Sequence, residues 1–437
     1  MSLKVDDIET IQLGDAFMLS QNFTFLSVLS LLVAGTAAAD DTLAPEWEAE
    51  RVSKRPIDAE AAQFVPGKGL EIASVDGDFK LQTRLRAQYL YQGVMTADED
   101  AEHYFMIRRA RLQFSGNMWG KNNKFKAEIA ISPRDDSFEG VDFNGDDADD
   151  SNLVKTTPLL DWYQEFTQIR DLNVRIGQYK VPYSRQRVIS SGNLQLVDRS
   201  VTSNAEFTLD RDLGIDIRSK DLFGLDLFKY YAGVYIGEGR NTSNKTIGAG
   251  DQGLMYIARV EVLPFGSFKD YSEADLARST EPGLSIGAAY AYVAEAPKTR
   301  GILGSTITDD VWNYQNVTGD LMFKYAGFSL LSEVFMRQGE AESGVATSNG
   351  WGTMAQAGYL IPNTAAEITG RYGMNRRIGT ETESVFDEGL NEAGGGVGYY
   401  FAHHPLKLQA DVFRIWNEAD GQEAGELMIR SQLQAAF

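Results

Sequence analysis

The chain has 437 residues, no cysteine and a formal net charge of −21. Its length suits either two or three soluble domains or one large β-barrel. The lack of cysteine excludes disulfides and thiol chemistry, and the presence of only three histidines argues against a zinc site. The acidic balance argues against nucleic acid as a partner. We expect neither a metal nor a cofactor.

The N-terminal region has the features of an export signal. An apolar run occupies residues 23–35, and the small residues Ala37-Ala38-Ala39 after it form a cleavage pattern. Lys4 is the only cation ahead of the run, so translation starting at Met18 stays an alternative. We predict a signal peptide over residues 1–39 and a polar lead-in over residues 40–68, which we expect to be a solvated tail. A third region, residues 69–437, contains the recurring pattern described next.

Apolar and polar residues alternate with period two from Gly77 onward, as in β-strands that have one apolar face. No later stretch has the 18 or more apolar residues of a membrane helix, so only a closed barrel would let this chain cross a membrane. The connections are alternately short and long, and the one at residues 264–283 breaks this rule by being long. Sixteen segments show the alternation: 79–91, 109–118, 124–131, 158–168, 171–182, 211–219, 225–236, 254–263, 284–292, 311–325, 328–337, 351–361, 364–374, 393–401, 406–416 and 427–437.

These features predict an all-β protein, a transmembrane antiparallel β-barrel of about sixteen strands in a bacterial outer membrane. The segment 427–437 ends on Phe437, which is typical of the closing strand of such barrels, and we expect Phe437 to be read by the barrel-assembly machinery. Aromatic residues near strand ends, such as Tyr89, Trp119 and Tyr399, are expected to lie at the membrane interfaces. The alternative is that these aromatic residues belong to the core of an ordinary β-protein.

Several motifs in residues 77–219 resemble, in order, those of the phosphate-selective porin O/P family. The resemblance implies a sixteen-stranded barrel, usually trimeric, in contact with outer-membrane lipid and lipopolysaccharide, with its third long loop folded into the pore. It does not name the solute. The motifs are GDFKLQTRLRAQYLY (77–91), RRARLQFSGNMWGKNNKFKAEI (108–129), LLDWYQEF (159–166), LNVRIGQYKVPYSRQ (172–186), SSGNLQLVDRS (190–200) and RDLGIDIRS (211–219).

The polar parity of a barrel strand faces the lumen, and in the first three strands this parity is basic. A low-dielectric wall focuses such charge into a water-filled pore, so small anions should be attracted. The alternative is that these cations pair with acids of the infolded loop and only brace the barrel. The predicted pore-lining residues are Lys80, Arg84, Arg86, Arg109, Arg111, Lys124 and Lys126, with Glu128 as the exception.

The long connection 183–210 is the candidate constriction, and Arg185, Arg187 and Arg199 are its candidate anion-binding residues. Planar guanidinium groups can bind two oxygens of an oxyanion at once. Asp198 and Glu206 in the same loop argue against strict phosphate selectivity. We therefore predict a general diffusion porin with a modest anion bias.

Two other classes stay open: a plugged barrel with a structural or adhesive role, and a secreted soluble β-enzyme. The enzyme reading is weak because a hydrolase needs a nucleophile beside a base. His103 has no nearby serine, and His403 and His404 are expected in a periplasmic turn far from the lumen. We expect no catalysis. Acidic runs such as residues 135–150 are expected to be solvated.

Overall fold

The computed structural model describes residues 59–97, 100–132, 158–204, 207–242, 253–296, 298–304, 312–343, 347–379, 389–418 and 425–437. The predicted signal peptide and the acidic run at residues 135–150 lie outside these ranges. Residues 59–437 form one compact unit. No helix in the described ranges combines the length and apolar character needed to span a membrane.

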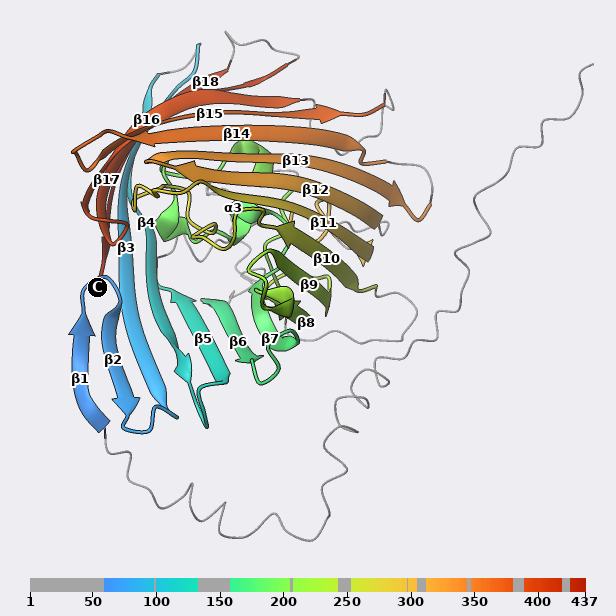
Figure 1. Cartoon of the computed structure of the whole chain (residues 1–437). Helices are drawn as coiled ribbons and strands as arrows, with labels where there is room; N and C mark the ends of the chain where they lie inside the picture. The colour runs from blue at the N-terminus through green and yellow to red at the C-terminus, as the bar shows by residue number, and fades with distance from the viewer. Residues whose placement is uncertain are drawn as a thin grey trace, which may run out of the picture. The chain divides into compact units, whose positions relative to one another are not determined.

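Sixteen antiparallel strands, β3 to β18, each pair with the next in sequence, and β18 pairs with β3 to close a barrel (Figure 1). Each of them overlaps one of the sixteen predicted segments, so the predicted fold class is confirmed. Their bounds are β3 (Lys80–Met95), β4 (Glu102–Asn117), β5 (Asn123–Ala130), β6 (Leu159–Phe166), β7 (Asn173–Lys180), β8 (Arg211–Ser219), β9 (Phe228–Tyr235), β10 (Met255–Val262), β11 (Gly283–Ala296), β12 (Trp312–Tyr325), β13 (Phe328–Ala341), β14 (Gly350–Leu360), β15 (Ala366–Arg377), β16 (Leu390–Ala402), β17 (Leu406–Asn417) and β18 (Glu426–Ala436).

A hairpin of β1 (Ala59–Val65) and β2 (Gly69–Ser74) precedes the barrel. Strand β18 covers β3 only from Arg86 to Met95, and β2 pairs with the remaining stretch from Lys80 to Thr83. The hairpin therefore covers an edge of β3 that the stagger of the barrel leaves open. The sequence-based expectation of a solvated tail does not hold for residues 59–65, because this uncovered edge supplies backbone partners for the hairpin.

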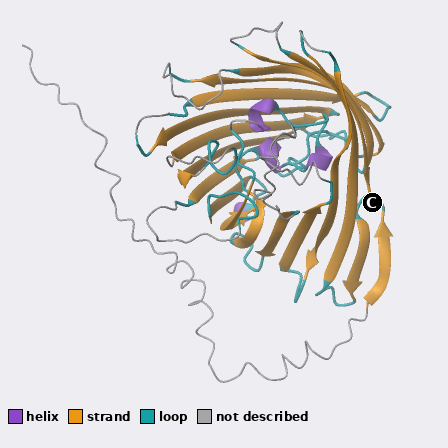
Figure 2. Ribbon diagram, turned by 180° about the vertical axis from the view of Figure 1, so that it is seen from behind, coloured by secondary structure: helices purple, strands orange, loops and turns teal. Residues whose placement is uncertain are grey.

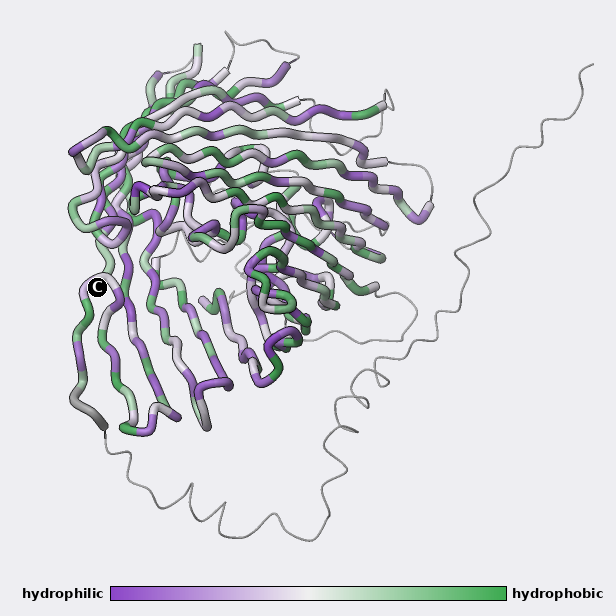
Figure 3. Tube along the Cα trace, in the orientation of Figure 1, coloured by the Kyte–Doolittle hydropathy of each residue, from purple (hydrophilic) through white to green (hydrophobic). Residues whose placement is uncertain are grey.

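Hydrophilic and hydrophobic residues follow one another along the strands of the wall (Figure 3), and the burial of their side chains separates an outer from an inner face. Outward side chains are largely apolar and exposed, for example Tyr89 at 44% and Trp162 at 60%. Inward side chains such as Gln88 and Gln434 are polar and fully buried. Burial of polar groups inside a barrel requires partners within the lumen, and the chain itself provides them.

One such partner is the connection between β7 and β8, residues 181–210, which we call the constriction segment. It contains three short helices, α3 (Arg185–Val188), η2 (Ser191–Asn193) and α4 (Val201–Asn204). These helices lie inside the ring of strands (Figure 2). The prediction of a long loop folded into the barrel is confirmed.

A second infolded stretch is the connection between β10 and β11, residues 263–282, which we call the inner connection. It contains Ser272, whose Oγ lies 3.0 Å from Nε2 of His404 in the turn between β16 and β17. His404 is only 5% exposed, so the expectation that this histidine lies far from the lumen is wrong. The inner connection is long because it fills space inside the barrel, which explains the break in the alternation of loop lengths.

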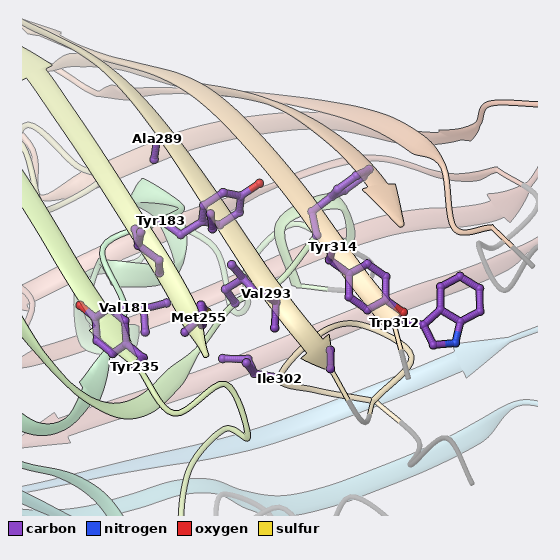
Figure 4. Close-up of a cluster of buried hydrophobic side chains, with 14 of the residues drawn as sticks. Val181, Tyr183, Tyr235, Met255, Ala289, Val293, Ile302, Trp312 and Tyr314 are labelled. Carbon is purple, nitrogen blue, oxygen red and sulfur yellow. The ribbon is translucent and has the colours of Figure 1, made fainter. Parts of the chain in front are cut away.

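Part of the interior is apolar (Figure 4). Tyr183 and Phe207 of the constriction segment pack with inward residues of the wall such as Met255 and Val293 in one buried cluster. The sequence analysis assigned the polar parity to the lumen, and β10 and β11 depart in part from that rule, since Met255, Ile257 and Val293 point inward. They can do so because the apolar ends of the constriction segment cover them and keep water away.

Candidate functional site

Four side chains of alternating positive and negative charge lie next to one another on the inner face of β4, β5 and β6. Arg111 and Glu128 form an ion pair with a 2.8 Å contact between Nη1 and Oε1. The Nζ of Lys126 lies 2.8 Å from Glu128 and 2.5 Å from Asp161. Two of the predicted pore cations thus reach the lumen with carboxylate partners beside them, which reduces the net field that they add to the pore.

Lys80 and Lys124, the predicted cations nearest the short turns, lie in more exposed surroundings than Arg111 and Lys126. The Nζ of Lys80 lies 2.7 Å from Glu71 of β2, at a partly exposed site. Lys124 is exposed and forms no ion pair with any described carboxylate. Both residues lie near the short-turn ends of their strands, where Lys80 and Lys124 each pair with Asn117 of β4.

Arg109 contacts the constriction segment together with its neighbour Arg108. A β-bulge in β4, opposite Gln88 and Tyr89, breaks the alternation at this point. Both arginines then donate to Asp198, each at 2.9 Å. β-bulges commonly re-aim side chains in this way. Here the bulge attaches the constriction segment to β4.

Arg84 and Arg86 carry the predicted charge without an acidic partner. Arg86 donates from its two terminal nitrogens to the hydroxyls of Ser190 and Ser191, each at 3.1 Å. Among the described residues, neither arginine forms an ion pair with a carboxylate. Their positive charge is therefore not neutralised by a direct ion pair.

The structure corrects the expected role of Arg185. Its side chain is fully buried and ion-paired with Asp320 at 2.5 Å and with Asp270 at 3.1 Å. A guanidinium without exposed surface cannot meet a solute in the lumen. Arg185 instead joins the constriction segment to the inner face of β12 and to the inner connection.

The two other predicted arginines of the constriction segment also make contacts within the protein. The Nη2 of Arg187 lies 2.7 Å from Asp210, and its side chain keeps 17% exposure. Arg199 donates to the main-chain oxygens of Gln186 and Ile189, at 3.0 and 2.7 Å. Arg187 therefore retains some access to water, whereas Arg199 holds the constriction segment in shape.

Open space remains between the constriction segment and the wall formed by β3 to β8. A cavity of about 180 Å³ is lined by Arg111, Lys126, Glu128, Asp161, Tyr163, Arg175, Tyr179, Lys180, Val188, Ser190 and Arg211. A smaller cavity is lined by Arg84, Arg86, Arg111, Gln113 and Glu128. Both cavities share Arg111 and Glu128, so they are neighbours along one side of the lumen.

Three lining cations, Arg175, Lys180 and Arg211, were not among the predicted site residues. Arg175 follows the inward parity of β7, and the same rule applied to this strand would have found it. Lys180 and Arg211 face each other at the ends of β7 and β8, directly before and after the constriction segment. Lys180 donates to the main-chain oxygens of Arg187 and Ile189, at 2.6 and 3.2 Å. Strand alternation does not predict such positions, because the chain leaves the wall there.

Comparison with known proteins decides the family. The sequence model "Phosphate-selective porin O and P" matches residues 79–423. The chain belongs to the phosphate-selective porin O and P family. An uncharacterized protein of Aquifex aeolicus (strain VF5) is 25% identical to this porin over 383 residues, which are 84% of this chain and 89% of that one.

Solved structures support the same fold. An anion-selective porin from Comamonas acidovorans has a TM-score of 0.54 and 12% identity, covering 82% of this porin and 99% of that chain. The outer-membrane channel DcaP of Acinetobacter baumannii has a TM-score of 0.50 and 12% identity, covering 84% and 99%. Family and fold together place this porin in the bacterial outer membrane.

Proposed function

We propose that this porin passes small hydrophilic solutes by passive diffusion with a preference for anions. The observation that carries the proposal is the charge of the two adjoining cavities, which count seven basic against two acidic lining side chains. The basic ones are Arg84, Arg86, Arg111, Lys126, Arg175, Lys180 and Arg211, and the acidic ones are Glu128 and Asp161. Diffusion needs no catalytic group, and the proposal includes none.

Ion pairs neutralise some of these cations, and the net field comes from the rest. Arg175 donates to Glu165 at 2.7 Å, and Arg211 contacts Asp161 at 2.6 Å. Arg84, Arg86 and Lys180 form no ion pair with a described carboxylate. A pore with low-dielectric walls concentrates the field of such charges, so anions should enter more readily than cations.

Phosphate-type anions are candidate solutes of this pore. Guanidinium groups match oxyanion geometry, and three arginines line the smaller cavity. The family name also points to phosphate, and one protein of similar fold is an anion-selective porin. Reversal potentials measured with chloride and then with phosphate as the anion will show which of the two anions is the more permeant.

The substitution Arg84→Gln tests the anion preference. It removes one positive charge from a side chain that holds no part of the constriction segment. We expect the zero-current potential across a planar bilayer in a KCl gradient to shift toward cation preference. Lys121→Gln, an exposed change of equal charge in the turn between β4 and β5, is the control. Equal potentials for Arg84→Gln and the unchanged protein would contradict the proposal.

A plugged barrel with a structural role is the second candidate, because two infolded segments and an apolar cluster occupy much of the interior. Reconstitution separates the two. A channel gives stepwise conductance in planar bilayers, whereas a plugged barrel gives none. We also propose a homotrimer, as the family resemblance implies, and light scattering of the detergent-solubilised protein will give the number of subunits.

A further inference from the structure

The inner connection is attached to the barrel wall at several places, and two of these attachments flank Glu273. The Nζ of Lys324 on β12 donates to the main-chain oxygens of Lys269 and Ala274, at 2.7 and 3.1 Å. At the other place, Ser272 contacts His404 at 3.0 Å. Because residues 269–274 are held at both sides, the stretch between these contacts has a fixed position relative to the wall.

Glu273 lies in this fixed stretch and contacts the constriction segment. Its carboxylate accepts hydrogen bonds from Gln186 Nε2 at 3.1 Å and from the main-chain N–H of Gln195 at 2.7 Å. It also accepts from Gln356 Nε2 of β14 at 2.9 Å. Its own main-chain N–H donates to the oxygen of Asn193 at 3.2 Å.

The electrostatic setting of Glu273 is unusual. The residue is 1% exposed, and among the described residues it forms no ion pair. A buried carboxylate costs free energy unless hydrogen bonds satisfy it. Here neutral amide donors satisfy both oxygens, and two of these donors belong to the constriction segment. The buried carboxylate is therefore satisfied only while the constriction segment keeps Gln186 and Gln195 within hydrogen-bond distance of it.

The residues that Glu273 contacts flank the part of the constriction segment that faces open space. Val188 and Ser190 line the larger cavity, and both lie between Gln186 and Gln195 in the chain. A shift of the segment away from its present position would change the width of that cavity. Arg185 and Asp270 form a further contact between the same two segments, at 3.1 Å.

We propose that the inner connection supports the constriction segment from the short-turn end of the barrel, and that Glu273 is the positioning residue that sets the pore width. This inference rests on the proposed channel function. Glu273 touches no solute, and it acts through Gln186 and Gln195. Loss of its carboxylate should loosen the segment and enlarge the pore, while the wall of sixteen strands persists.

The substitution Glu273→Gln tests this role while keeping the shape of the side chain. Its amide oxygen can accept from Gln195 and Gln356, but its nitrogen then faces the nitrogen of Gln186. Gln186 cannot simply turn over, because its oxygen accepts from Ser200 and Ser203. We expect a higher single-channel conductance and greater open-channel noise, with an unchanged barrel in unheated gel electrophoresis.

The double variant Glu273→Gln/Gln186→Glu supplies the rescue. It places a carboxylate opposite the new amide nitrogen and leaves the total charge of the unaltered protein, so conductance and noise should return to their original values. Glu281→Gln is the matched control, since Glu281 is an exposed glutamate of the same connection. We expect this control to conduct like the unaltered protein.

Three outcomes would overturn the proposal. One is original conductance and noise in folded Glu273→Gln. A second is a change that Gln186→Glu fails to reverse. If Glu273→Gln does not fold, Lys324→Gln is used instead, because it removes a contact of the inner connection without altering the constriction segment. The third outcome is original conductance and noise in Lys324→Gln. Absence of any conductance in the unaltered protein would instead contradict the channel function itself.

Discussion

At the scale of single residues, Asp198 decides how much of the predicted basic charge is available to a solute. Burial alone would raise the pKa of the Asp198 carboxyl, but the charges of Arg109 and Arg108 lower that pKa well below its usual range. The carboxylate therefore stays charged when the pH falls through the ordinary aspartate value of about 3.9. The group of Arg108, Arg109 and Asp198 therefore keeps a single net positive charge over that whole range, instead of the two charges that the arginines alone would carry.

The substitution Asp198→Asn removes this neutralisation. Arg108 and Arg109 then lose their carboxylate partner, and the zero-current potential in a KCl gradient should shift toward stronger anion preference. Some stability should be lost as well, because the buried Arg109 loses the carboxylate of Asp198. Asp100→Asn, an equal charge change at an exposed residue, is the control. An unchanged potential in Asp198→Asn would show that the two arginines do not reach the ion path.

At the scale of elements, the β1–β2 hairpin covers the part of β3 that β18 leaves open. Phe437 and Leu85 exchange two main-chain hydrogen bonds, at 2.7 and 2.9 Å, just before β2 takes over the pairing. Gly69 makes this approach possible. Its φ is +90°, and a Cβ at this position would lie 2.0 Å from the main-chain oxygen of Thr83.

Replacing Gly69 with alanine should therefore detach β2 from β3. We expect a lower temperature for the heat-induced mobility shift of the barrel in gel electrophoresis, with a cost on the order of 1–3 kcal/mol from backbone strain alone. Gly266→Ala is the matched control, because its φ is +87° and no atom lies within 4 Å of the added Cβ. Equal shifts in both variants would mean that strain, and not the contact with β3, determines the effect.

At the scale of the whole molecule, the porin combines a net charge of −21 with a basic lining of the two cavities in its lumen. The two charges act at different places, since the cations are gathered on β3 to β8 around the open space. An anion entering this space is surrounded by the cations at short range, and salt screens the other charges of the molecule.

This arrangement predicts a selectivity that depends on salt. The screening length falls from about 10 Å at 0.1 M to about 3 Å at 1 M ionic strength. At a fixed ratio of KCl concentrations, the anion preference should therefore decrease as both concentrations rise. Zero-current potentials measured at several mean concentrations will check this. A constant potential would indicate selection by direct contact instead of by the field of the lumen.

The sequence by itself determined the barrel. Period-two alternation is a property of the extended backbone, so it can be read locally, and all sixteen strands of the wall were predicted from it. The same rule assigned Arg84, Arg86, Arg109 and Arg111 to the inner face. It failed for the β1–β2 hairpin, because β2 pairs with the stretch of β3 that β18 leaves open.

Only the tertiary structure decided which of these charges remain available to a solute. Arg185 finds Asp320 across a separation of 135 residues, and Arg109 finds Asp198 across 89. Neither pairing has a local signal, because each depends on how a connection folds back into the lumen. The infolding of residues 263–282 and the apolar cluster on one side of the barrel also have no local signal in the sequence. Both depend on side chains from distant strands that meet in the same space.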